Sequence, residues 1–174
     1  MSEAWIIDAV RTPRGIGKVG KGALADLHPQ HLGATVLKAL AERNNIKTNE
    51  VDDIIWGTSS QRGKQGGDLG RMSALDAGYD VRSSGVTLDR FCGSGISTVN
   101  FATGMIMSGL EDCVIAGGTE MMSYTASTAN PSAGPQLMDG GKMHLRALHP
   151  QSHQGICGDA IATLEGIPRE ALDE

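Results

Sequence analysis

Cys92 stands directly before a glycine-rich turn in the stretch DRFCGSGIST, residues 89–98. We predict a strand over residues 85–91 and a helix over residues 93–109, which places the thiol at the start of a helix. A helix N-terminus has unpaired N–H groups and a partial positive charge, which favour a thiolate and can hold an oxyanion. Gly93 and Gly95 leave room for a substrate at the backbone. The pattern predicts a nucleophile that forms an acyl intermediate, with a buried structural cysteine as the alternative.

The other thiols and the histidines near them give weaker patterns. Cys113 lies within an apolar stretch and is expected to be a core residue. His149, His153 and Cys157 follow one another at four-residue spacing, which one face of a helix could use to bind a metal. Pro150 interrupts that helix, and the set holds one thiol, so we expect no metal site.

The composition limits which classes of protein this chain can belong to. The chain has 174 residues, of which 40% are hydrophobic and 20% charged, as in ordinary globular domains. A net charge of −5 does not indicate the basic surface with which proteins bind nucleic acid. No apolar run approaches the ~20 residues of a membrane helix, and the start MSEAWIIDAVRTP lacks the features of a secretory signal. Three cysteines without tight spacing do not indicate a disulfide framework, so a cytoplasmic protein is expected.

Strand and helix patterns alternate along the first two thirds of the chain. Apolar runs predict strands at residues 4–10, 52–60, 85–91 and 112–120, the first of them buried. Three- and four-residue spacings predict helices at residues 31–44, 69–78 and 93–109. This alternation predicts an α/β domain with a mostly parallel sheet. Ligands in such sheets bind outside the carboxyl ends of the strands, which is where Cys92 is expected.

Polar and glycine-rich stretches predict the loops. RTPRGIGKVGKG, residues 11–22, lacks the Walker spacing of a phosphate loop and is expected to be a flexible surface loop. RGKQGGDLGR, residues 62–71, is expected to be an exposed loop leading into a helix. Near residue 123 the alternation stops, and a long excursion follows whose length favours a functional role. Residues 156–167 are predicted to form a helix, and another is predicted to start at residue 168.

Several separated motifs together resemble the thiolase family, the acyl-CoA acetyltransferases. They are IIDAVRTPRG, VDDIIWGT, DRFCGSG, VIAGGTEMMS and SHQGICGDAIATLEGIPRE, and they occur in the family's order over essentially the whole chain. The resemblance implies an α/β, thiolase-like fold of two similar βαβαβαββ halves, with a loop domain inserted in the first. Residues 1–121 would then be the core of the first half, and residues 122–174 the start of the loop domain.

The resemblance also implies an activity and a set of site residues. It implies reversible acyl transfer between coenzyme A thioesters, as thiolytic cleavage of a 3-ketoacyl-CoA or condensation of two acyl-CoA molecules, with no bound cofactor or metal. Cys92 matches the acyl-accepting nucleophile. His153 and Gln154 match a loop-domain segment that lines the thioester and pantetheine pocket, where Gln154 replaces a more usual Met. The alternative for His153 is a surface loop residue. Met121 and Met122 are expected in the core beneath the site.

The family's second half has no counterpart here. It carries Gly-His-Pro, Cys-x-Gly and Asn-Glu motifs that supply the catalytic base, a second thiol and part of an oxyanion hole. The first two do not occur in this sequence, and its Asn-Glu pair, Asn49-Glu50, lies in the part that matches the first half. We therefore expect a C-terminal thiolase half, in the same or a separate chain, as a partner. Residues 62–71 match a loop that crosses to a second subunit, so a homo-oligomer, dimer or tetramer, is expected. A ketoacyl synthase is disfavoured by the glycines after Cys92, and a non-catalytic acyl-CoA or lipid carrier, or an inactive half, remains the alternative.

Overall fold

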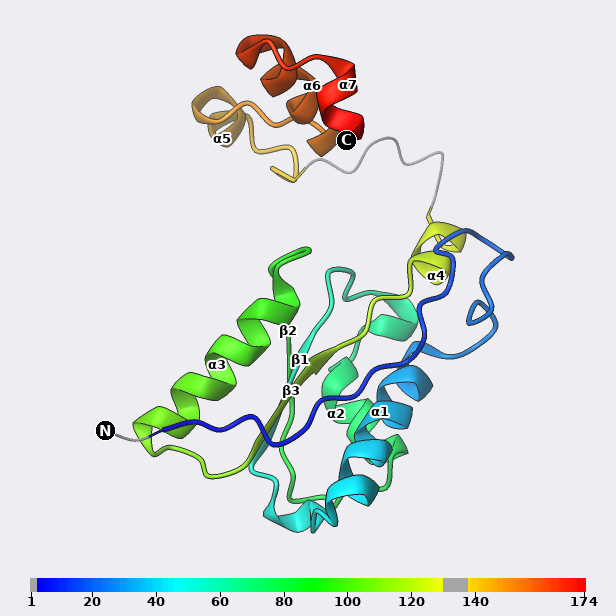
Figure 1. Cartoon of the computed structure of the whole chain (residues 1–174), viewed down its shortest axis with the longest axis vertical. Coiled ribbons are helices and arrows are strands. Elements are labelled where there is room, and N and C mark those ends of the chain that lie inside the picture. Colours follow the sequence, from blue (N-terminus) through cyan, green and yellow to red (C-terminus); the bar gives the residue numbers. More distant parts are fainter. Residues whose placement is uncertain (1–2, 130–137) are drawn as a thin grey trace. The chain divides into compact units, whose positions relative to one another are not determined.

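The computed structural model describes residues 3–129 and 138–174 (Figure 1). The chain divides into two compact units, Met1–Ala129 and Asn130–Glu174, and each is described by itself. The predicted domain boundary after residue 121 stays a prediction. No helix in the described ranges has the length and apolar character needed to span a bilayer.

The first unit is built on a parallel sheet of three strands. These are β1 (Asp53–Gly57), β2 (Val86–Leu88) and β3 (Val114–Gly118), in the order β2-β1-β3. Ile55 of β1 is in register with Val86 on one side and Ala116 on the other. The α/β class and the parallel pairing are confirmed, although each strand is shorter than the apolar run that predicted it.

Two helical layers enclose this sheet. The helices α1 (Pro29–Asn44) and α2 (Leu69–Asp76) lie on one side and α3 (Ser94–Ser108) on the other, as Figure 1 shows. Short 3-10 turns occur at Thr48–Glu50 (η1) and Gly63–Gln65 (η2), and α4 (Met122–Ser127) follows β3. His28 accepts a hydrogen bond from the N–H of Gln30 at the start of α1, and Asn45 ends that helix in the left-handed conformation.

The core lies between β1 and the layer of α1 and α2. Its buried members are Leu37, Val51, Ile54, Trp56, Leu69, Ala74, Tyr79 and Ile115. Gly70 brings α2 against the central indole, since a Cβ there would lie 2.5 Å from the Cβ of Trp56. The Tyr79 hydroxyl donates to the carbonyl of Leu37 at 2.9 Å, and burial raises its pKa to about 12. Close approach of the α2 backbone at Gly70 thus lets a chain with few aromatic residues pack tightly around Trp56.

The predicted strand at residues 4–10 is wrong. These residues run as an extended segment outside any strand, and Trp5, Ile6 and Ile7 are 77%, 82% and 80% exposed. An apolar run becomes a strand only when a neighbouring backbone completes its hydrogen bonds, and the described residues offer this segment none. Asp8 ties this segment to α1, because it pairs with Arg43 and accepts a hydrogen bond from Asn44.

The second unit consists of three short helices. They are α5 (Met143–Leu148), α6 (Gln154–Glu165) and α7 (Arg169–Asp173), so both helices predicted after residue 156 are confirmed with shifted bounds. Asp139 is buried and holds Arg146 through two hydrogen bonds of 2.7 and 2.9 Å. Among residues 138–174 no apolar side chain is buried, and Leu164 of α6 is strongly exposed.

Candidate active site at the carboxyl ends of the strands

Cys92 lies on the turn between β2 and α3, with its side chain exposed. The turn is held by its own neighbours. Phe91 has a φ of 50°, a left-handed conformation that is uncommon for a bulky residue. The carboxylate of Asp89 accepts a hydrogen bond from the Phe91 N–H at 2.7 Å, and the Ser94 hydroxyl donates to the Phe91 carbonyl at 2.6 Å. The predicted strand-to-helix position of Cys92 is confirmed.

Ser94 also fixes how closely α3 approaches the sheet. Its hydroxyl accepts from the N–H of Arg90 at 2.8 Å, and the residue is buried. A Cβ at Gly57 would lie 3.0 Å from the Cβ of Ser94, so the absence of a side chain at the end of β1 lets the helix start there. The first N–H groups of α3 and the thiol are therefore presented at the carboxyl ends of the strands, as the sequence predicted.

Glu120, two residues beyond β3, gathers donors from the loop that follows β1. One carboxylate oxygen accepts from the Thr58 hydroxyl at 3.1 Å, and from the N–H and hydroxyl of Ser59 at 2.6 and 2.7 Å. The other accepts from the Gln65 amide at 3.1 Å. Partial desolvation alone would raise the pKa of Glu120, but the hydrogen bonds from Ser59, Gln65 and Thr58 outweigh it and hold the pKa below its usual value.

Residues 62–64 and Gly67 are exposed, as predicted for the loop that leads into a helix, but Gln65 within this loop is fully buried. Besides Glu120, its amide donates to the Thr58 hydroxyl and the Ser60 carbonyl, and its carbonyl oxygen accepts from the N–H of Met121 at 2.7 Å. A buried amide of this kind must satisfy all its hydrogen-bonding groups, so the loop is anchored rather than free. Sequence reasoning missed Gln65 and Glu120; the signal for Glu120 was its place at the end of a predicted strand.

Three further sulfur-containing residues can be compared with their predictions. Met121 is buried as expected, whereas Met122 is 64% exposed, which corrects its assignment to the core. Met122 is the first residue of α4, and its side chain lies against Gly17. Cys113 packs against the core cluster, and its desolvation, together with the negative charges of Asp52 and Glu50, raises the pKa of its thiol.

His153 and Gln154 lie in the second unit, at the start of α6. The Nδ1 atom of His153 accepts a hydrogen bond from the N–H of Gly155 at 3.2 Å, which leaves the proton of the neutral ring on Nε2. Both side chains are exposed. Since the two units are described separately, a place for this pair beside Cys92 stays a prediction. Within residues 3–129 and 138–174, no group of three or more His, Cys, Asp or Glu side chains is arranged to hold a metal ion.

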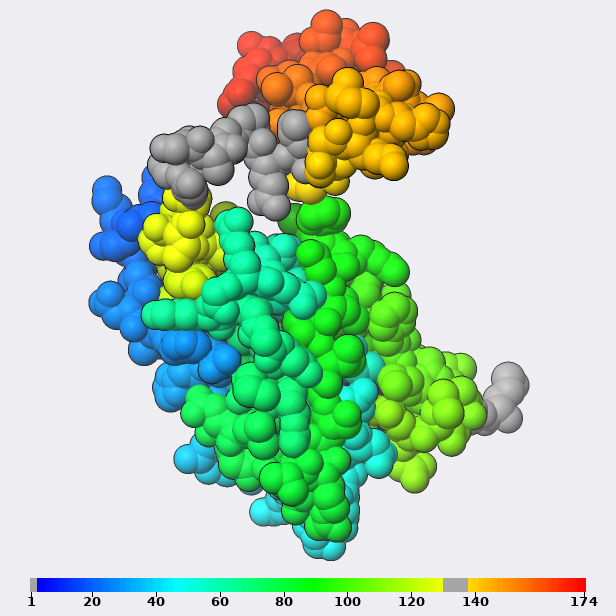
Figure 2. All heavy atoms as spheres, turned by 180° about the vertical axis from the view of Figure 1, so that it is seen from behind, coloured from blue at the N-terminus to red at the C-terminus, as the bar shows by residue number. Residues whose placement is uncertain are grey.

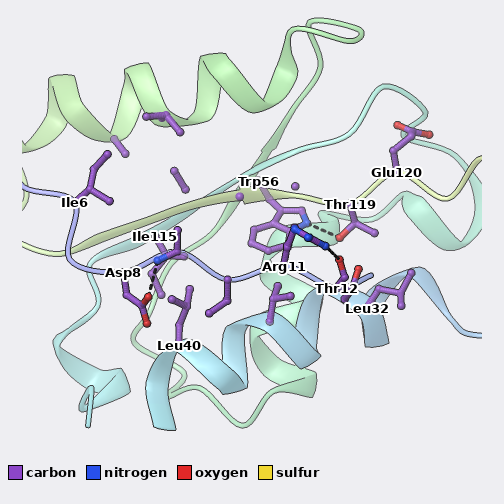
Figure 3. A pocket seen from close by; sticks show the side chains of 18 of the residues that line it. Ile6, Asp8, Arg11, Thr12, Leu32, Leu40, Trp56, Ile115, Thr119 and Glu120 are labelled. Atoms are coloured by element: carbon purple, nitrogen blue, oxygen red, sulfur yellow. Dashed lines mark hydrogen bonds between the residues drawn. The ribbon is translucent and has the colours of Figure 1, made fainter. Parts of the chain in front are cut away.

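A groove of about 1000 Å³ lies in the first unit, along the edge of β3 that does not face β1. Its walls are the extended residues 4–17, the strand β3 itself, and apolar side chains of α1 and α3 that include Leu32, Leu40 and Ile106. Figure 3 shows Ile6, Asp8 and Arg11 along this hollow, with Leu32 and Leu40 beneath. Sequence reasoning did not predict it.

Comparison with known proteins identifies relatives of this chain. Residues 4–174 match the family model described as "Thiolase, N-terminal domain". The chain is 43% identical over 137 residues to the steroid 3-ketoacyl-CoA thiolase FadA6 of Mycobacterium tuberculosis, covering 79% of this chain and 33% of that protein. It is 35% identical to an acetyl-CoA acetyltransferase of Cupriavidus necator, covering 100% of this chain and 45% of the relative.

A solved structure agrees. The Bacillus anthracis acetyl-CoA acetyltransferase superposes with a TM-score of 0.62 at 35% identity, over 68% of this chain and 29% of that one. The chain thus spans less than half the length of the relatives named here. The match over nearly all of the chain, the shared fold and the identities have one common explanation: this chain belongs to the thiolase family.

Proposed function

We propose that this chain supplies the acyl-accepting part of a thiolase, an acyl-CoA acyltransferase. The observation that carries the proposal is the exposed Cys92 on the turn between β2 and α3, in a chain of this family. In thiolysis the Cys92 thiolate attacks the 3-keto carbonyl of a 3-ketoacyl-CoA, the C2–C3 bond breaks, and acetyl-CoA leaves with a proton taken up at its α-carbon; the acyl group then passes from Cys92 to the thiolate of a second coenzyme A. In condensation the Cys92 thiolate attacks the thioester carbonyl of an acyl-CoA and the coenzyme A thiolate leaves; the acyl group then passes to the α-carbon of a second acyl-CoA, which loses a proton.

The start of α3 supports this chemistry. Negative charge develops first on the thiolate and then on the carbonyl oxygen of the tetrahedral intermediate. Both lie where the first N–H groups of α3 and its partial positive charge act most strongly. Gly93 and Gly95 keep this approach open, since a Cβ on Gly95 would meet no atom within 4 Å. The thioester therefore reaches Cys92 without displacing a side chain of the turn.

His153 and Gln154 are proposed to contact the thioester and pantetheine part of the substrate. The Nε2–H of His153 is an exposed donor of fixed orientation, because Nδ1 is used at the start of α6. The amide of Gln154 adds a donor and an acceptor where an apolar Met would give neither. Coenzyme A and acyl-CoA enter this proposal as substrates.

A C-terminal thiolase half, in the same or a separate chain, is the proposed partner that completes the active site. The outer edge of β3, which pairs with no strand among residues 3–129 and 138–174, and the groove beside it support this, since such an edge with apolar walls suits an added polypeptide segment. The exposed apolar side chains of α3, such as Ile96 and Phe101, extend the same uncovered surface. A homo-oligomer, dimer or tetramer, is expected of the completed protein.

Acetyl-CoA provides the direct test of the nucleophile. We expect peptide mapping after brief exposure to acetyl-CoA to place the acetyl group on Cys92, and the Cys92→Ser variant to remain unlabelled. Cys157→Ser is the matched control, because Cys157 is equally exposed but lies on α6. Labelling that follows Cys157 instead, or that is absent even with a C-terminal half present, would favour the non-catalytic carrier.

The partner has its own test. The region of the Cupriavidus necator acetyl-CoA acetyltransferase beyond the matched part would be added to this chain, and complex formation followed by gel filtration. We expect a complex in which acetyl transfer to Cys92 is faster. A stable monomer with full thiolase activity on its own would contradict the requirement for a second half.

A further inference from the structure

We propose that Glu120 is a positioning residue for Cys92, acting through the ends of all three strands of the sheet; this rests on the proposed function of Cys92. Glu120 does not belong to the Cys92 turn. It lies beyond β3, and its carboxylate accepts four hydrogen bonds from the loop after β1. Two series of contacts, one through Thr58 and one through Gly57, connect this carboxylate with the turn that carries the thiol.

The first connection runs through Thr58. Its hydroxyl donates to Glu120 at 3.1 Å, and its backbone N–H donates to the carbonyl of Leu88 at 3.1 Å. Leu88 is the last residue of β2, four residues before Cys92. The position of Thr58 therefore sets where β2 ends and where the Cys92 turn begins.

The second connection runs through Gly57. The N–H of Thr119, next to Glu120, donates to the Gly57 carbonyl at 3.0 Å. Gly57 in turn lies against Ser94, whose hydroxyl holds both Arg90 and Phe91 in the turn. A shift of the loop after β1 would move this support and the turn with it.

A carboxylate suits this position better than an amide. Every group directed at Glu120 is a donor: the hydroxyls of Thr58 and Ser59, the N–H of Ser59 and the amide of Gln65. An amide NH₂ on either side would face a donor and leave it without an acceptor. Gln65 is fully buried and so depends on this partner. Glu120→Gln should therefore displace the loop, although it is nearly isosteric.

The test measures alkylation of Cys92 by iodoacetamide between pH 6 and pH 10, by peptide mapping of the 174-residue chain. Three variants are compared: Glu120→Gln, Glu120→Asp and Thr119→Val. Cys157, in the second unit, serves as the internal reference, and the melting temperature reports global stability. Thr119→Val removes the acceptor of the Trp56 N–H bond of 3.0 Å at the same strand end but leaves the Glu120 contacts in place. The charged residues Asp89 and Arg90 of the turn are unchanged in all variants.

A positioning role and a purely electrostatic role for Glu120 predict opposite results for the alkylation of Cys92. A misplaced turn loses the helix-terminus field, so we expect both Glu120 variants to react about two- to five-fold more slowly at Cys92 near neutral pH. The pH midpoint should also rise, while Thr119→Val lowers only the melting temperature. If Glu120 acted by charge alone, Glu120→Gln would lower the midpoint and Glu120→Asp would leave it unchanged. Either of those results, or an unchanged Cys92 in both variants, would overturn the proposal.

An inactive Cys92 and a Glu120 without a positioning role would give different results. The rate at Cys92 relative to Cys157 in the unaltered chain tests whether Cys92 is an activated thiol, as the proposed function requires. The ratio of each variant to the unaltered chain tests positioning, whatever the absolute rate. Acetyl transfer from acetyl-CoA to Cys92, measured in the same variants, should fall in parallel with alkylation.

Discussion

The two faces of the sheet differ in how completely they are covered. On one face α1 and α2 bury Leu37 and Leu69 without residual exposure. On the other face Ile96 and Val99 of α3 remain 71% and 44% exposed. The space-filling view shows the green helix α3 at the surface of the first unit (Figure 2). One layer therefore encloses a core, whereas the other leaves large apolar side chains exposed.

The sequences of the helices explain this difference. α1 carries Lys38, Glu42 and Arg43, which give it a polar side for solvent. α3 carries no charged residue in SGISTVNFATGMIMS. A helix with no charged residue and with large apolar side chains on its outer side is typical of the interior of a protein, between two layers. The composition of α3 thus indicates a second covering layer, which agrees with the C-terminal half that we propose.

Truncation of one apolar side chain on each face should give the largest contrast. We expect Leu37→Ala to lower the free energy of unfolding by about 2–5 kcal/mol, because it leaves a cavity in a closed core. Ile96→Ala should change it by less than about 0.5 kcal/mol, because that side chain is already in water. Urea denaturation measures both. Equal losses would mean that α3 is as well packed as α1.

Replacement of a mid-helix glycine by alanine should change the free energy of unfolding in opposite directions on the two faces. At Gly33 of α1 a Cβ would collide with the Ser73 hydroxyl and lie 3.3 Å from the Trp56 ring, so Gly33→Ala should cost about 1–3 kcal/mol. At Gly104 of α3 a Cβ would meet nothing within 4 Å, so Gly104→Ala should stabilise the chain by about 0.8–1 kcal/mol through helix propensity. Thermal unfolding distinguishes them. A destabilising Gly104→Ala would show that α3 already has a close neighbour.

The smallest effect is expected at the N-terminal segment, which the closed layer holds through α1. Hydrogen bonds from Asn44 and from the N–H of Ala9, with the charge of Arg43, lower the pKa of Asp8. The contact is therefore complete above the ordinary value of 3.8 and is lost as the pH falls through the lower, folded value. Amide signals of residues 4–10, followed by NMR from pH 7 downward, should sharpen only in that acid range.

Removal of the Asp8 side chain should have the same local effect at any pH. We expect Asp8→Ala to speed trypsin cleavage after Arg11 by at most a few-fold, because an ion pair whose cation is exposed to water contributes little. Asp26→Ala is the control, since Asp26 makes no hydrogen bond or ion pair with the described residues and should leave cleavage unchanged. A change in global stability with Asp8→Ala would mean that the segment is part of the core.

Short-range sequence patterns were sufficient to predict many of the helices and strands of this protein. The helices around α1 and α3 and the three parallel strands follow from apolar spacing, because each is paired or packed within the same unit. The position of Cys92 follows from a glycine-rich turn between a strand and a helix. The segment at residues 4–10 has the same apolar character as β1, yet it is not a strand, because pairing requires a second backbone that no local pattern supplies.

The amino-acid sequence by itself determined the α/β class, the family motifs and the cysteine that we propose as nucleophile, because these depend on residue type and short-range spacing. Only the tertiary structure decided that Gln65 is buried, that Glu120 gathers the loop after β1, and that one edge of β3 faces a groove. The physical reason is sequence separation. Gln65 and Glu120 are 55 residues apart, and their hydrogen bond exists only once β1 and β3 lie side by side.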